Sequence, residues 1–377
     1  MPKHYLNENL VDSSLGLFYK NREVILALNM GRIFYVNGTD GDDTTGARGR
    51  FDKPYKTISA AIAAAPNTGD IIEVMTGTYN ENVTGKVSGF THLVLRGATI
   101  NGNININNNT GSGVMYLLQG SRVNGSYSGT FGGMIISDGS GIWNGQLIMP
   151  NGSGRVKGLR TWSTTTTSLS DTLTTNCIIE DIDLVESSYE WNFRTGDNVE
   201  GHATNRNAIL RNIRILRNTS ELATARVFNP VNEISLDTIE NIGLIECRNG
   251  KIHNDLWRPF RLFHCQNVTF KSKLQSFYAQ ALTFNAYNSR FICTDESIFK
   301  HNSNIVENVG LMKFYQCQFQ AGAVAPSILE NTNFGPKLEL FCSQYNKANF
   351  NTGIANTTES LGFNSVVETI NIRTAKY

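Results

Sequence analysis

The chain has 377 residues, of which 40% are hydrophobic and 17% are charged, so it can form one large core. Lys and Arg number 33 against 32 Asp and Glu, and this balance provides no overall field for nucleic acid or an anionic membrane. We therefore expect no nucleic-acid partner and no membrane insertion. The six cysteines show no C-x-x-C pair and no zinc-type spacing, so we expect free thiols, no metal site and no cofactor.

Residues 1–33 form the first predicted segment, which carries Leu, Phe, Tyr and Ile but lacks the long apolar core of a secretory signal peptide. The apolar run at 24–30 is too short to cross a bilayer. A short, partly apolar segment of this kind is typical of a device that becomes ordered on a partner. We predict that residues 1–33 attach the chain to other proteins.

Residues 34–70 are predicted to hold a strand, a loop and a capping α-helix. Apolar residues recur at helical spacing in the Ala-rich run 56–65, and Pro66 ends the run. The following "IIEVM" (71–75) is typical of a strand, and "TGTY" (76–79) predicts a turn.

Residues 71–377 lose helical periodicity and consist of short apolar strands separated by Gly, Asn and Asp. Ile182, Ile213 and Ile242 occupy equivalent places in three similar stretches, 31 and 29 residues apart. Such a repeat of short strands predicts an all-β, single-stranded solenoid in which each coil pairs with the next. Recurring Cys and Asn residues at one turn are predicted to stack inward, and the helix at 56–65 is predicted to cover the open first coil.

Four stretches within residues 34–83 carry a family resemblance: "YVNGTDGDD", "KPYKTISAAI", "GDIIEV" and "GTYNENV". In this order they resemble the N-terminal segment of pectin-lyase-like proteins. The resemblance implies a right-handed parallel β-helix with an N-terminal capping helix. Such segments occur in polysaccharide lyases, in surface proteins and in phage tailspikes, and the tailspikes are the most similar in overall character.

The catalytic motifs of that family are incomplete in this sequence. "WRPFR" (257–261) is one residue short of the family's arginine motif on each side of the proline. "GDD" (41–43) precedes the predicted helix instead of lying in the coils, and "GHA" (201–203) stands where the family has Gly-His-Gly. The resemblance therefore implies the fold more strongly than any one reaction.

A cluster of acidic residues supplies the candidate catalytic groups. Asp181 and Asp183 alternate with apolar residues, which predicts that both face one side of a strand. Paired carboxylates can act as general acid and base in glycoside cleavage, so Asp181, Asp183, Glu186 and His202 are the candidate catalytic residues. The alternative is that these are ordinary acids on an exposed strand and a histidine in a loop.

The longest polar insertion of the middle coils is 187–207, and loops inserted in a rigid solenoid often carry binding residues. Tyr189, Trp191 and Arg194 lie in this insertion, and Trp257 lies in a later polar stretch. Aromatic rings stack on sugars and Arg donates hydrogen bonds to them, so these four are candidate carbohydrate-binding residues. Simple packing of the loops is the alternative.

Three functional hypotheses follow from these observations. The first is a bacteriophage virion protein, a tail or capsid spike without enzymatic activity. It would be made in the host cytoplasm, join other virion proteins through residues 1–33 and bind host cell-surface polysaccharide. The second is a polysaccharide lyase or glycoside hydrolase on the same fold, and the third is a bacterial surface adhesin.

A homotrimer is predicted for the same chain, because spikes of this kind are usually trimers and gain avidity from three equal faces. The aromatic residues between Phe260 and Tyr287 outnumber what one coil interior needs, which predicts that some face a subunit interface. The aromatic residues considered for that interface include Phe263, Phe277, Tyr278 and Phe284.

Overall fold

The structure is a computed structural model that describes part of the chain. The described residues are 17–19, 22–24, 32–66, 69–85, 91–105, 113–128, 134–148, 154–164, 177–195, 207–230, 234–253, 260–274, 277–278, 283–296, 298–301, 311–320, 329–331, 337–341, 359–363 and 369–373. Within these ranges no helix has the length and hydrophobicity needed to cross a bilayer.

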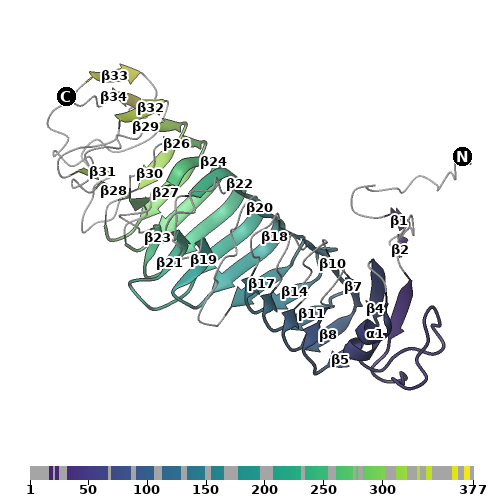
Figure 1. The fold of residues 1–377 in the computed structure, drawn as a ribbon. Helices are drawn as coiled ribbons and strands as arrows, with labels where there is room; N and C mark the ends of the chain where they lie inside the picture. The colour runs from purple at the N-terminus through teal and green to yellow at the C-terminus, as the bar shows by residue number, and fades with distance from the viewer. Residues whose placement is uncertain are drawn as a thin grey trace, which may run out of the picture.

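The chain winds into coils that stack along a rod, and each coil has up to three strand-bearing faces (Figure 1). The first face holds β3 (Ile33–Val36), β4 (Asp70–Val74), β7 (Thr91–Arg96), β10 (Val114–Leu118), β13 (Met134–Ser137), β16 (Arg155–Lys157), β26 (Thr283–Tyr287), β29 (Leu311–Tyr315) and β32 (Lys337–Phe341). The second face holds β5 (Gly77–Tyr79), β8 (Ala98–Asn101), β11 (Arg122–Asn124), β14 (Ile142–Asn144), β17 (Thr161–Thr164), β27 (Arg290–Cys293) and β30 (Gln318–Gln320).

Four long strands in the middle of the rod bend from the first face to the second: β18 (Cys177–Ser187), β20 (Asn207–Asn218), β22 (Ile234–Cys247) and β24 (Phe260–Ser272). The third face consists of short strands: β6 (Val83–Thr84), β9 (Ile104–Asn105), β12 (Tyr127–Ser128), β15 (Leu147–Ile148), β19 (Trp191–Thr195), β21 (Arg226–Pro230), β23 (Lys251–His253), β25 (Phe277–Tyr278), β28 (Phe299–His301) and β31 (Leu329–Asn331).

Successive coils pair in parallel with equivalent residues side by side. Ile182 stands opposite Ile213, so these two anchors of the sequence repeat occupy the same place in neighbouring coils. The same parallel register continues from β20 through β22, β24, β26 and β29 to β32. The fold is thus a right-handed parallel β-helix, and the predicted fold class is confirmed.

One corner of the coil, between the first and second faces, repeats a left-handed backbone conformation. Asp181, Asn212, Asn241, Asn267 and Asn288 have φ of 54°, 53°, 52°, 55° and 45°. Each Asn amide donates to the side-chain oxygen of the preceding coil, over 2.9, 3.3, 2.9 and 2.8 Å. These side chains are exposed, so an amide ladder exists, but the prediction that it stacks inward is wrong.

The interior of the rod is filled by apolar side chains in the same register. Phe263 stacks on Phe284 with ring centroids 4.6 Å apart and planes 7° from parallel, and both rings are buried. The prediction that aromatics of this region face outward is therefore wrong for these two, because alternation places them inside. The side chains of Phe277 and Tyr278 lie outside the described residues.

Four cysteines, Cys247, Cys265, Cys293 and Cys317, are buried free thiols, as the sequence predicts for them. Burial raises the pKa of Cys247 to about 12 and that of Cys317 to about 11. These thiols therefore pack as small apolar groups. The side chains of the other two cysteines lie outside the described residues.

The predicted cap is present as α1 (Ile58–Ala64), which packs against β3, β4 and β6. Ile58 and Ile62 are buried in the same core as the first coils. The helix is tied to the first coil by Glu81, whose carboxylate accepts hydrogen bonds from the backbone N–H of Ile58 at 2.9 Å and of Ser59 at 3.0 Å. These bonds satisfy N–H groups that every helix leaves free at its start.

The acidic stretch that precedes the helix has a structural role. The carboxylate of Asp43 accepts hydrogen bonds from the backbone N–H of Lys56 at 2.7 Å and of Thr57 at 2.9 Å. Thr57 is the N-cap residue, and its hydroxyl accepts a bond from the backbone N–H of Ala60 at 3.2 Å.

Some local predictions need correction. Residues 77–79 of the predicted turn form β5, which pairs with β8, so the bend comes earlier.

Two strand pairs are antiparallel and stand apart from the coil pattern: β1 (Leu17–Tyr19) with β2 (Arg22–Val24), and β33 (Glu359–Phe363) with β34 (Thr369–Arg373). β34 lies against β32, the last described parallel strand.

Candidate functional site

The three candidate catalytic carboxylates lie on β18, and each meets a side chain of β20 in the next coil. The amide of Asn212 donates to Asp181 over 2.9 Å as the first step of the ladder. Arg214 Nε donates to Asp183 Oδ1 over 2.5 Å. Glu186 forms an ion pair with Arg217, its partner in the strand register on β20.

This arrangement suits ion pairing between coils better than proton transfer. The hydrogen bond from Arg214 holds the pKa of Asp183 below its usual range. A general acid in a glycosidase needs the opposite shift, because it must keep its proton near neutral pH. Catalysis by Asp181, Asp183 or Glu186 stays a prediction that the geometry does not favour.

Glu180 is an acidic residue that the sequence did not single out. Its side chain is 3% exposed, and it accepts hydrogen bonds from Arg155 Nε of the coil before and from Arg211 Nε of the coil after, each over 2.7 Å. Lys157 Nζ lies 3.7 Å from the same carboxylate. The strand register places Glu180 opposite Lys157 of the coil before and Arg211 of the coil after. Only a knowledge of this register would have predicted the cluster from the sequence.

Three of the four candidate carbohydrate-binding residues lie on or beside the third face. Tyr189 is half-buried just before β19, and its backbone N–H donates to Ser187 Oγ over 3.1 Å. Trp191 and Arg194 belong to β19, which pairs with β21, and their side chains lie outside the described residues. His202 and Trp257 also lie outside them.

The topology nevertheless relates these residues to one another. Residues 196–206, which include His202, join the end of β19 to the start of β20. Residues 254–259, which include Trp257, join the end of β23 to the start of β24. The strand before each connection lies on the third face of one coil and the strand after it begins on the first face of the next, and we call the side of the rod between these two faces the connection edge. Their starting points are two coils, or about 10 Å, apart.

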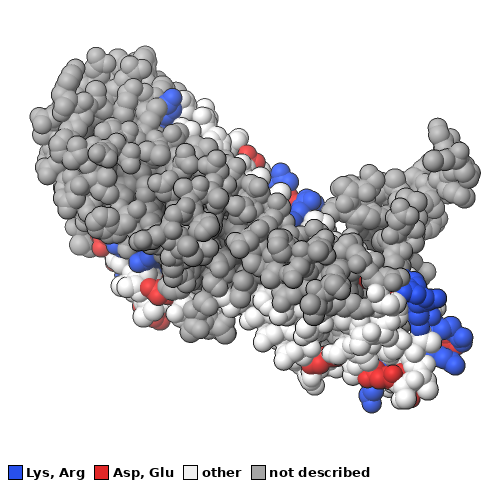
Figure 2. Space-filling view, in the orientation of Figure 1, with Lys and Arg blue, Asp and Glu red and all other residues white. Residues whose placement is uncertain are grey.

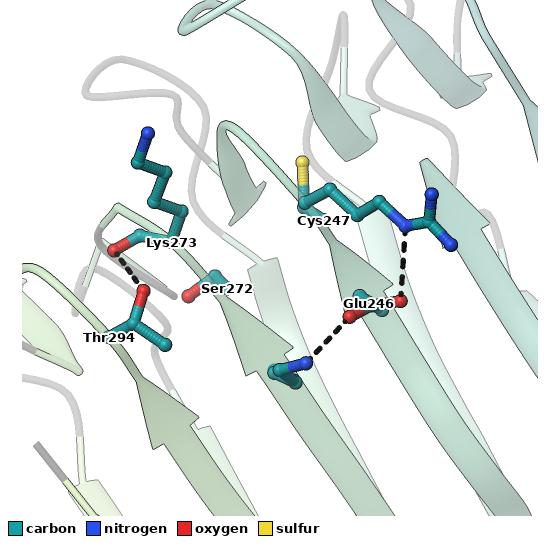
Figure 3. Close-up of a pocket in the computed structure, with 7 residues that line it drawn as sticks. Glu246, Cys247, Ser272, Lys273 and Thr294 are labelled. Carbon is teal, nitrogen blue, oxygen red and sulfur yellow. Dashed lines mark hydrogen bonds and ion pairs between the residues drawn. The ribbon is translucent and has the colours of Figure 1, made fainter. Parts of the chain in front are cut away.

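A second cluster lies at the corner of the coil where the second face meets the third face. A cavity of about 470 Å³ opens there, and we call it the basic cavity (Figure 3). The lining residues come from three successive coils: Glu246, Cys247 and Arg248; Lys271, Ser272 and Lys273; and Thr294. Three cations thus surround one carboxylate.

The carboxylate of this cavity is shared between two of the cations. Glu246 Oε1 lies 2.9 Å from Lys271 Nζ, and Glu246 Oε2 lies 3.7 Å from Arg248 Nε. Among the described residues, no carboxylate pairs with the ammonium group of Lys273, and no dashed line reaches it in Figure 3. This cluster was not predicted from the sequence, although "ECR" (246–248) and "KSK" (271–273) occupy equivalent places in neighbouring coils.

The charged side chains elsewhere form small mixed groups. On the face shown in Figure 2, the described Lys and Arg lie close to Asp and Glu at the N-terminal end of the rod and along its lower margin. Within the described part of the chain, no three His, Cys, Asp or Glu side chains gather as a metal site.

Comparisons with protein-family models, with curated proteins and with solved structures found no match. The resemblance of residues 34–83 to pectin-lyase-like proteins therefore stays a prediction from the sequence.

Proposed function

We propose that this chain is a non-enzymatic glycan-binding rod, the tail or capsid spike of a bacteriophage, that binds host-surface polysaccharide along its side. The observation that carries the proposal is the connection edge. A rigid β-helix holds the starts of successive connections at a fixed spacing, and an extended polysaccharide has a repeat that such a row can follow. Two of these connections contain or adjoin the candidate binding residues.

The pairing of the acidic residues supports binding without cleavage. Asp183 and Glu186 are both engaged by arginines of the next coil, and the pKa of Asp183 is lowered. A depolymerising enzyme is the alternative function, and it would need a carboxyl group that keeps its proton near neutral pH.

The virion setting is supported by the resemblance of residues 34–83 to the N-terminal segment found in phage tailspikes, among other proteins. In this proposal residues 1–33 join other virion proteins, and three chains form the spike. A bacterial surface adhesin would use the same rod and the same edge, so the glycan-binding test applies to both settings.

The test is binding of the full-length chain to immobilised capsular and lipopolysaccharide glycans. Trp191→Ala and Trp257→Ala should each weaken binding about tenfold or more, since aromatic anchors dominate such interfaces. Phe51→Ala is the matched control, because Phe51 is an exposed aromatic residue, 64% accessible, that contacts Tyr35 of β3, several coils before β19. Failure to bind any glycan, or equal affinity of all three variants, would contradict the proposal.

A further inference from the structure

Opposite charges follow one another from coil to coil along this rod. On the first face, Arg211 Nε donates to Glu180 of the preceding coil over 2.7 Å, and these two residues are partners in the strand register. Arg214 pairs in the same way with Asp183. On the second face, Lys271 pairs with Glu246 at 2.9 Å, and these two residues are partners in the strand register. Parallel stacking therefore selects opposite charges at equivalent positions.

The basic cavity contains an exception to this pattern. Cys247 and Ser272 are register partners, and the next residue along each strand is a cation, Arg248 in one coil and Lys273 in the next. The backbone N–H of Lys273 donates to the carbonyl of Cys247 over 3.3 Å, which keeps the two coils in register. Two like charges thus occupy equivalent places in adjacent coils, an arrangement that costs stability.

The neighbouring coils do not compensate for this pair. Thr294 occupies the place of Lys273 in the next coil, because its backbone N–H donates to the carbonyl of Ser272 over 3.0 Å. Glu246 is the carboxylate that lines the cavity, and its contact with Arg248 is long, at 3.7 Å. A local conflict of this kind is expected at functional sites.

The shape of the site suits a small ligand. Its volume of about 470 Å³ lies within the range of roughly 300–1,000 Å³ found for small-molecule sites. The side chains of Arg248 and Lys271 are 50% and 44% exposed, so their charged ends are accessible from solvent. Arg248 offers several N–H donors and Lys273 an ammonium group, which are the groups that bind carboxylates and phosphates in proteins.

We propose that the basic cavity binds an oxyanion carried by an acidic glycan, with Lys273 and Arg248 as the direct contacts. The proposal deepens the glycan-binding function above and rests on it. The bound anion would lie between two cations that otherwise repel each other, so ligand binding would remove the conflict in the charge pattern.

Binding of fluorescent oligosaccharides to the full-length chain tests this inference. The probes are an α2,8-linked sialic acid tetramer, its neutral methyl ester, a glycerol-phosphate oligomer and a neutral dextran oligomer. We expect the wild type to bind one or both acidic probes and to bind the methyl ester at least tenfold more weakly. The preference between the sialic acid and glycerol-phosphate probes assigns the oxyanion as a carboxylate or a phosphate.

Lys273→Glu should weaken binding of the acidic probe at least tenfold. Lys53→Glu, which makes the same change of net charge at an exposed lysine near the other end of the rod, should stay within twofold of the wild type. The melting temperature of Lys273→Glu should be equal to or above that of the wild type, because a like-charge pair becomes an opposite-charge pair. Lys273→Gln removes the charge alone and should also weaken binding.

The inference is overturned if neither acidic probe binds, if the methyl ester binds as well as the acid, or if the two glutamate variants behave alike. Binding of neutral host polysaccharides together with no binding of either acidic probe would overturn this inference and leave the proposed function standing. Absence of binding to any polysaccharide would contradict both.

Discussion

Asn241 meets two separate requirements at the corner between the first and second faces. Its φ of 52° is a conformation that Asn adopts more readily than other non-Gly residues, and its amide also donates to Asn212 of the preceding coil. The sequence revealed Asn at a repeating turn. It could not show that the side chain points outward, because a left-handed residue at a corner does not follow the in-and-out alternation of a strand.

Replacing Asn241 separates the two requirements. Asn241→Gly keeps access to positive φ and loses the ladder bonds, so we expect a loss of about 0.5–1 kcal/mol in the free energy of unfolding. Asn241→Ala loses the bonds and strains the backbone as well, and should cost about 1–2 kcal/mol more. Chemical denaturation of both variants gives the comparison, and equal losses would show that backbone conformation plays no part.

Glu180 shows what a single sequence cannot reveal about charge. In the sequence it is one acid among several, but its burial depends on which residues the neighbouring coils place opposite it. Burial disfavours its ionised form, yet hydrogen bonds from Arg155 and Arg211 hold its pKa below the usual value. Glu180 is therefore a structural residue of the middle coils.

Glu180→Gln should lower the free energy of unfolding at pH 7 by about 2–4 kcal/mol, because it leaves partly buried cations without their carboxylate. The pKa of Glu180 is lower in the folded state, so its contribution is complete above the unfolded pKa of about 4.3. That contribution disappears as the pH falls through the folded pKa. The stability gap between wild type and variant should thus shrink from pH 7 to pH 3, and a gap that does not depend on pH would contradict the assignment.

Among the elements, those with strong hydrophobic periodicity could be predicted from the sequence, and the shortest strands could not. The helix was predicted at 56–65 and spans Ile58–Ala64, and the strand predicted at 71–75 spans Asp70–Val74. Strands of the third face contain as few as two residues, too few for any alternation to be visible. The basic cavity was missed for a different reason: coil register decides which charges meet there, and a single sequence does not show the register.

The cap can be tested by one buried substitution. Ile62 is 6% exposed, and Ile62→Asp would place an unpaired charge against the first coil. We expect a loss of about 3–5 kcal/mol, or loss of soluble protein. Ala63→Asp adds the same charge on the exposed side of the helix and should change stability by less than about 1 kcal/mol. Equal melting temperatures for the two variants would count against the cap.

For the whole molecule, the parallel β-helix explains the composition and the repeat, while assembly stays a proposal. Two of the aromatics that suggested a subunit interface, Phe263 and Phe284, pack inside the rod. Tyr287 is half-buried on the outer side and stacks on Tyr315 with ring centroids 4.7 Å apart. The trimer now rests on the resemblance to spikes and on the advantage of three equal binding faces.

Light scattering of the full-length chain at micromolar concentration measures the assembly. A trimer should give three times the chain mass of 41.7 kDa. A mass near that of one chain would rule out the trimer and leave glycan binding to a single rod.

The central claim is that the rod binds surface glycan without cleaving it. The most direct measurement is the size distribution of a host polysaccharide before and after long incubation with the full-length protein, by size-exclusion chromatography with light scattering. The account predicts that polysaccharide elutes together with the protein and keeps its chain length. Progressive shortening of the polysaccharide, lost in Asp183→Asn, would contradict the account and assign the rod to the depolymerising enzymes.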